Sequence, residues 1–61
     1  MNVLVIGGGG REHAIITALA KSKKVDKLYA APGNGGISKY AECFNVKATD
    51  IDGCVELAKK L

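Results

Sequence analysis

The sequence predicts an α/β fold built on a partial parallel sheet, with elements in the order strand, helix, strand, strand, helix (β-α-β-β-α). Three observations support this prediction. An apolar, largely β-branched run opens the chain, a run of four glycines follows it directly, and the next segment has apolar residues at helical spacing. Such a sequence is typical of the first half of a Rossmann-like unit, in which the crossover is right-handed and the strands are parallel.

The first strand is expected over residues 2–6, where the continuous apolar run is typical of a strand buried on both faces. The glycines Gly7 to Gly10 end it. A helix is expected over residues 11–21 and should be covered over much of its surface, because apolar residues occupy most of it. These apolar residues are Ala14, Ile15, Ile16, Ala18, Leu19 and Ala20.

The second strand is expected over residues 27–31 and should stop at Pro32. A loop, PGNGGISKYA, covers residues 32–41, because Pro-Gly and Asn-Gly are both turn signals. A short third strand is expected over residues 43–46.

The last expected element is a helix that begins after Thr49 or Asp50, either of which can cap its first turn. Gly53 weakens this helix by about 1 kcal/mol relative to alanine. Its apolar residues should lie on one face of the helix; they are Ile51, Cys54, Val55, Ala58 and Leu61.

The chain has 61 residues, which is enough for one small domain. A chain of this length buries only about 60% of the surface that its unfolded form exposes. A doubly wound sheet normally has roughly five or six strands, and the chain ends where a fourth strand is expected. We therefore expect residues 1–61 to be the N-terminal part of a domain in a larger protein.

The composition excludes several classes of function. The net charge is +3, but the lysines are scattered and only three aromatic residues are present, which argues against a nucleic-acid surface. Two cysteines and one histidine form no zinc pattern, so we expect two reduced thiols and no metal site. No secretory signal and no apolar stretch of about 20 residues is visible. The expected location is cytoplasmic, away from membranes.

Two glycine-rich loops follow the first two strands: Gly7 to His13, and Pro32 to Ser38. Ligands of such folds bind beyond the carboxyl ends of the strands. Backbone N–H groups of a glycine loop, helped by the helix that follows, converge on an anion. Arg11 adds a guanidinium that can form paired hydrogen bonds with phosphate oxygens. The loops therefore indicate a phosphate or sugar-phosphate site.

A dinucleotide site fits poorly. The pattern G-x-G-x-x-G requires a third glycine, but Glu12 or His13 stands there, depending on which glycine comes first. The acidic residue expected at the end of the second strand is also missing, because Asp26 precedes that strand. No glycine is followed by lysine, which excludes a P-loop. A fragment of a nicotinamide-dependent oxidoreductase and a non-catalytic phosphate-binding module stay open as alternatives.

Two stretches, VLVIGGGGREHA and YAAPGNGG, resemble the N-terminus of the phosphoribosylamine–glycine ligase (glycinamide ribonucleotide synthetase) family. The first matches the family's G-x-G-G-R-E-H-A loop, with glycine at position 8, where serine is frequent. The second matches its P-G-N-x-G loop. The matching residues are Gly7, Gly9, Gly10, Arg11, Glu12, His13, Ala14, Pro32, Gly33, Asn34 and Gly36.

The resemblance implies that residues 1–61 belong to a Rossmann-like pre-ATP-grasp domain. Ligases of this family join glycine to 5-phosphoribosylamine in de novo purine synthesis, with ATP and Mg²⁺ or Mn²⁺. A glycyl phosphate forms first and is attacked by the amine of the sugar phosphate. ATP and metal are held by ATP-grasp domains outside this chain, against which these residues pack, so the chain alone is expected to be inactive.

The resemblance also implies roles for residues of both loops. The N–H groups of Gly8, Gly9 and Gly10 face the sugar phosphate or ribose. Arg11 and Glu12 orient the loop or contact the ligand, and His13 braces the start of the helix. Substrate binding is completed from the second loop by Asn34 and Gly35. No catalytic acid or base is expected, because acyl-phosphate chemistry depends mostly on positioning and electrostatics.

Overall fold

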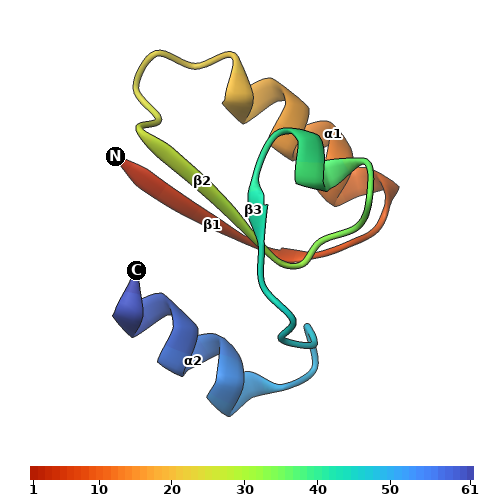
Figure 1. Cartoon of the computed structure of the whole chain (residues 1–61), viewed down its shortest axis with the longest axis vertical. Helices are drawn as coiled ribbons and strands as arrows, with labels where there is room; N and C mark the ends of the chain where they lie inside the picture. The colour runs from red at the N-terminus through yellow and green to blue at the C-terminus, as the bar shows by residue number, and fades with distance from the viewer.

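A computed structural model describes residues 1–61 and shows three parallel strands and two α-helices (Figure 1). The sheet order is β1-β2-β3, and both strand pairs are parallel. The elements are β1 (Asn2–Gly7), α1 (Gly10–Ala20), β2 (Lys27–Pro32), the 3₁₀-helix η1 (Ile37–Lys39), β3 (Glu42–Cys43) and α2 (Ile51–Lys60). The predicted α/β class and the order β-α-β-β-α are confirmed.

The expectation that Pro32 stops the second strand is wrong. β2 includes Pro32, which lies opposite Gly7 in the ladder. Proline lacks a donor, but the N–H of Gly33 donates to the Gly7 carbonyl oxygen at 3.1 Å, so β1 and β2 stay together past the proline. The two strands therefore end at the same level.

The third strand is shorter and earlier than predicted, at Glu42–Cys43 rather than residues 43–46. Pairing with β2 continues for one more bond, from the Phe44 N–H to the Ala30 carbonyl oxygen at 2.9 Å. The N–H of Val46 then donates to the Phe44 carbonyl at 2.8 Å. This tight local turn takes the backbone away from the sheet.

The core lies between the sheet, α1 and η1. Four buried residues form it, Ile16, Ala30, Ile37 and Ala41, and Val5, Leu28 and Cys43 pack against them. The expected apolar surface of α1 is only partly correct. Ile16 is fully buried, whereas Ala14, Ile15 and Ala18 point away from the sheet, and Ile15 is 51% exposed. Only one side of α1 is covered, because a single sheet and η1 are its neighbours.

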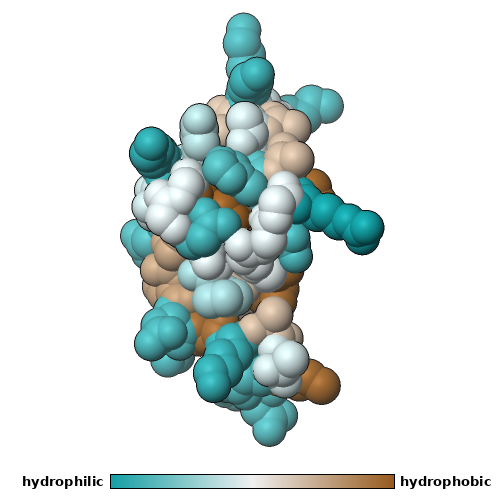
Figure 2. All heavy atoms as spheres, turned by 90° about the vertical axis from the view of Figure 1, so that its right-hand side faces the viewer, coloured by the Kyte–Doolittle hydropathy of each residue, from teal (hydrophilic) through white to brown (hydrophobic).

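The opposite face of the sheet is less well covered. α2 lies on the side away from α1 (Figure 1) and buries only Leu57. The apolar face predicted for this helix is largely exposed: Ile51 is 75% exposed and Val55 46% exposed. Figure 2 shows apolar surface left uncovered in the lower half of the molecule, the half that contains α2. β1 is an edge strand with Ile6 partly exposed, so it is not buried on both faces as expected.

The start of α2 follows the sequence closely. Asp50 is the N-cap, and its Oδ1 accepts a hydrogen bond from the Gly53 N–H at 2.9 Å. A Cβ at position 53 would collide with the Asp50 carboxylate. Gly53 therefore permits the cap, which offsets its poor helix propensity.

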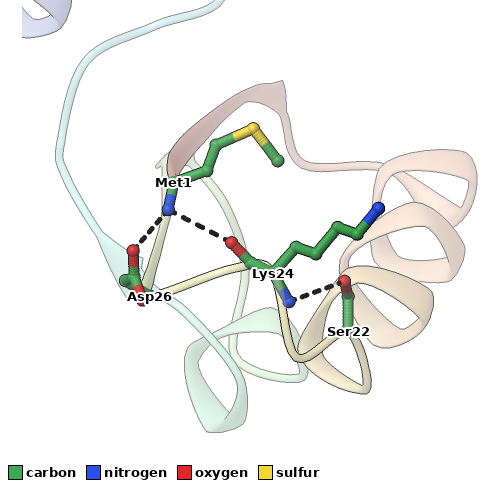
Figure 3. Close-up of polar contacts among 4 residues, drawn as sticks. All are labelled: Met1, Ser22, Lys24 and Asp26. Carbon is green, nitrogen blue, oxygen red and sulfur yellow. Dashed lines mark hydrogen bonds and ion pairs between the residues drawn. The ribbon is translucent and has the colours of Figure 1, made fainter.

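The N-terminus is tied to the start of β2 (Figure 3). The Met1 ammonium group forms an ion pair with the Asp26 carboxylate and donates to the Lys24 carbonyl oxygen at 3.1 Å. The Asp26 N–H in turn donates to the Met1 carbonyl at 2.8 Å. The hydrogen bond from the ammonium group, together with its positive charge, lowers the pKa of Asp26. None of the helices has the length and apolar character needed to cross a bilayer.

Candidate functional site: two tethered glycine loops

The two predicted loops lie side by side at one edge of the sheet. β1 and β2 are neighbours in register and end at Gly7 and Pro32, so the loops that follow begin next to each other. This is the edge formed by the carboxyl ends of the strands, where α/β folds bind ligands.

Glycine is needed at three positions of this contact. Gly7 and Gly33 adopt positive φ values of 136° and 70°, which side-chain-bearing residues rarely do. At Gly8 the requirement is space, because a Cβ there would lie 2.6 Å from the Gly33 carbonyl oxygen. The loops thus approach each other backbone to backbone.

Asn34 joins the two loops with its side chain. Its Nδ2 donates to the Gly8 carbonyl oxygen at 2.6 Å, and its Oδ1 accepts from the Ile37 N–H at 2.8 Å. Its backbone carbonyl accepts from the Ser38 N–H at 2.9 Å. The side chain is therefore engaged on both atoms within the protein.

The first loop presents unpaired donors. The N-cap of α1 is Gly9, and no side chain caps this helix. The N–H groups of Gly10, Arg11 and Glu12 in the first turn have no carbonyl one turn earlier within the helix. Together with the helix dipole, such donors favour an anion.

Further donors come from the loop residues outside the helix. Of the 16 backbone hydrogen bonds formed outside regular elements, none is donated by Gly8, Gly9, Asn34 or Gly35. The backbone N–H groups at these four positions also make no hydrogen bond with a side chain. The predicted site residues of both loops are thus gathered at one edge, with donors available on each.

The three residues after the glycines have different surroundings. Arg11 is exposed and forms no ion pair. The Glu12 carboxylate folds back over the loop, and its Oε2 would lie 3.3 Å from a Cβ at Gly9. The His13 ring packs 6.1 Å from the Tyr40 ring, between centroids, and its Cε1 would lie 2.8 Å from a Cβ at Gly36. Only Arg11 is free to reach a ligand without leaving a neighbour.

The surface formed by the loops is open, and no enclosed pocket is present. No group of three or more histidine, cysteine, aspartate or glutamate side chains is placed to hold a metal ion. Both cysteines are free thiols. The chemistry available here is binding through backbone donors and one guanidinium group.

Sequence reasoning missed the residues that support the second loop. Ser38 Oγ donates to the Gly35 carbonyl at 2.7 Å, and the buried Ile37 anchors the loop in the core. A serine shortly after the Gly35–Gly36 pair is only a weak sequence indication of such a hydrogen bond. The burial of Ile37 has no signal at all in a short loop sequence.

The comparisons with known proteins agree with the two motifs. Residues 1–61 match the family model described as phosphoribosylglycinamide synthetase, N domain. The chain is 53% identical over 58 residues to a phosphoribosylamine–glycine ligase of Caldanaerobacter subterraneus subsp. tengcongensis, which covers 95% of this chain. Ligases of the same name from Halalkalibacterium halodurans and Caulobacter vibrioides are 52% and 49% identical over 98% and 100% of this chain. The chain spans about 14% of the length of each of these relatives.

Proposed function

The chain belongs to the phosphoribosylglycinamide synthetase N-domain family, and from this premise we propose that it is the N-terminal, substrate-binding part of a ligase. The reaction joins glycine to 5-phosphoribosylamine with hydrolysis of ATP, in purine biosynthesis. The observation that carries the proposal is the pair of tethered glycine loops, which gathers free backbone donors at the ligand-binding edge of the sheet. The family match favours the ligase over an oxidoreductase that binds a nicotinamide cofactor.

The proposed sugar-phosphate site is built from seven residues, which either contact the ligand or hold the two loops in shape. The N–H groups of the first loop face its phosphate or ribose, and Arg11 supplies a positive charge. The Glu12 side chain holds the loop in shape, and the second loop completes the site. The residues are Gly8, Gly9, Gly10, Arg11, Glu12, Asn34 and Gly35.

The binding of ATP and metal belongs to other domains of the full-length ligase. We propose that ATP and Mg²⁺ or Mn²⁺ bind to ATP-grasp domains outside these 61 residues, and that the present domain packs against them. The chain then contributes binding and orientation but no acid or base. A cytoplasmic location is part of the same proposal, and so is the expectation that residues 1–61 alone are inactive.

The test is an assay of the full-length protein for ADP release that depends on ATP, glycine and phosphoribosylamine together. Arg11→Ala is expected to raise the KM for phosphoribosylamine roughly 10- to 150-fold and the KM for ATP less than twofold, because one charge-assisted hydrogen bond contributes on the order of 1.5–3 kcal/mol. Lys59→Ala, which removes an exposed charge from α2, is the matched control and should change neither value. Absence of turnover by the wild-type protein would refute the proposal, and equal changes in both KM values would refute the placement of Arg11.

A further inference from the structure

Two consecutive carbonyl groups of the first loop point toward the second loop. The Gly7 carbonyl oxygen accepts from the Gly33 N–H at 3.1 Å, and the Gly8 carbonyl oxygen accepts from Asn34 Nδ2 at 2.6 Å. The first of these bonds continues the β1–β2 ladder. The second comes from a side chain and lies beyond the sheet.

The direction of the Gly8 carbonyl determines the direction of the next N–H group. The Gly8–Gly9 peptide bond is trans, and in a trans peptide the C=O and N–H bonds point in opposite directions. Because the Gly8 carbonyl points to Asn34, the Gly9 N–H points away from the second loop. This N–H group makes no hydrogen bond within the protein.

Local sterics do not hold this peptide in place. It is flanked by Gly8 and Gly9, and neither residue has a Cβ to restrict rotation of the peptide plane. A Cβ at Gly9 would meet only the end of the flexible Glu12 side chain. The Asn34 hydrogen bond is therefore the contact that selects one orientation of the Gly8–Gly9 peptide.

We propose that Asn34 is a positioning residue, which acts on the ligand through the Gly8–Gly9 peptide rather than by touching the ligand itself. This inference rests on the proposed function. Both polar atoms of the Asn34 side chain are engaged with the protein, Nδ2 with the Gly8 carbonyl oxygen and Oδ1 with the Ile37 N–H, and these two contacts fix the orientation of its amide group. Its hydrogen bond to Gly8 turns the Gly9 N–H outward, beside the uncapped first turn of α1.

The proposal changes the expected shape of the site. The Gly9 N–H faces away from Asn34, so the sugar phosphate contacts this donor from the side opposite the Asn34 side chain. Asn34 then supports the first loop from behind and is not itself a wall of the site.

The experiment uses the full-length ligase and three variants. Asn34→Ala removes both side-chain contacts. Asn34→Ser removes the contact to Gly8, which the shorter side chain cannot reach, but keeps an oxygen that can accept from the Ile37 N–H. Asn45→Ala, the control, truncates an exposed asparagine that lies outside both loops.

We expect Asn34→Ala and Asn34→Ser to raise the KM for phosphoribosylamine by about tenfold, the loss expected for one misdirected donor to a charged group. The KM for ATP and for glycine should change less than twofold, and Asn45→Ala should resemble the wild type. A second readout is the NMR spectrum of ¹⁵N-glycine-labelled full-length protein titrated with ribose 5-phosphate. The Gly9 amide signal should shift on binding in the wild type and fail to shift in Asn34→Ser.

Two results would overturn the proposal. If Asn34→Ser behaves as the wild type while Asn34→Ala is impaired, the role of Asn34 is to hold the Ile37 turn and not the Gly8 peptide. If all three KM values rise together, Asn34 supports the fold only. An inactive wild-type enzyme would instead refute the proposed function, so the two failures are distinguishable.

Discussion

The two α-helices show that the apolar pattern of a helix does not by itself determine how much of the helix is buried. α1 has apolar residues around most of its circumference, yet it is well anchored, because it connects two strands that pair with each other and it packs on η1. α2 has its apolar residues gathered more clearly on one face, yet it buries only Leu57. α1 contacts β1, β2 and η1, whereas no strand or helix of the chain packs as extensively on α2. Burial therefore depends on which elements pack against a helix more than on the pattern of the helix itself.

The strongest test of this comparison is to truncate one isoleucine in each helix. Ile16→Ala, in the core beneath α1, should lower the free energy of unfolding by about 2–5 kcal/mol, because the side chain is fully buried and leaves a cavity. Ile51→Ala, at the start of α2, should change it by less than about 0.5 kcal/mol. Urea unfolding followed by circular dichroism measures both values. Similar losses in the two variants would show that the α2 face is covered in solution.

A smaller effect is expected at the N-cap of α2, where a substitution should destabilise this helix without destabilising the rest of the fold. Asp50→Ala removes the N-cap of α2 and should cost about 1 kcal/mol, because the Gly53 N–H loses its acceptor. The loss should be confined to α2, with faster amide exchange at Gly53 and Cys54 and no change in α1. Asp52→Ala, which alters the same turn without a capping contact, serves as the control. Faster exchange throughout α1 as well would show that the two layers unfold together.

The smallest expected effect concerns the ion pair at the start of the sheet, which belongs to neither helix. The pKa of Asp26 is lowered in the folded protein, so the charged carboxylate stabilises the fold above its unfolded pKa of about 3.8. That stabilisation is lost as the pH falls through the lower, folded pKa. Asp26→Asn should therefore be slightly less stable than the wild type at pH 7 and equal to it in strong acid.

The dependence on salt tests whether the difference in stability between Asp26→Asn and the wild type comes from the ion pair. Both partners are exposed, with 64% and 74% of their side-chain surface accessible, so about 1 M salt should remove most of the difference at pH 7. Urea midpoints measured against pH and salt test this. A difference between Asp26→Asn and the wild type that persisted in strong acid would point to a role for Asp26 other than its charge.

Much of the fold could be predicted because it depends on local pattern. The apolar opening run, the four glycines that follow it and the Asp50 cap predict β1, the start of α1 and the start of α2 to within a residue or two of their observed positions. Pro32 was misjudged because its effect depends on pairing: the Gly33 N–H, one residue later, supplies the donor that proline lacks. The exposure of part of α1 was not predicted for a similar reason, since apolar spacing shows which residues share a face but not what lies opposite that face.

The candidate site also has features that local sequence predicts and features that only the pairing of the strands explains. The residues 7–13 and 32–38 and their family likeness are visible in the chain, because glycine, asparagine and proline have strong backbone preferences that act locally. The hydrogen bond from Asn34 to Gly8 spans 26 residues of sequence, and no local preference encodes it. It exists because β1 and β2 pair in register and bring the two loops together. Chemical composition thus sets which donors are present, and the pairing of the strands decides where they point.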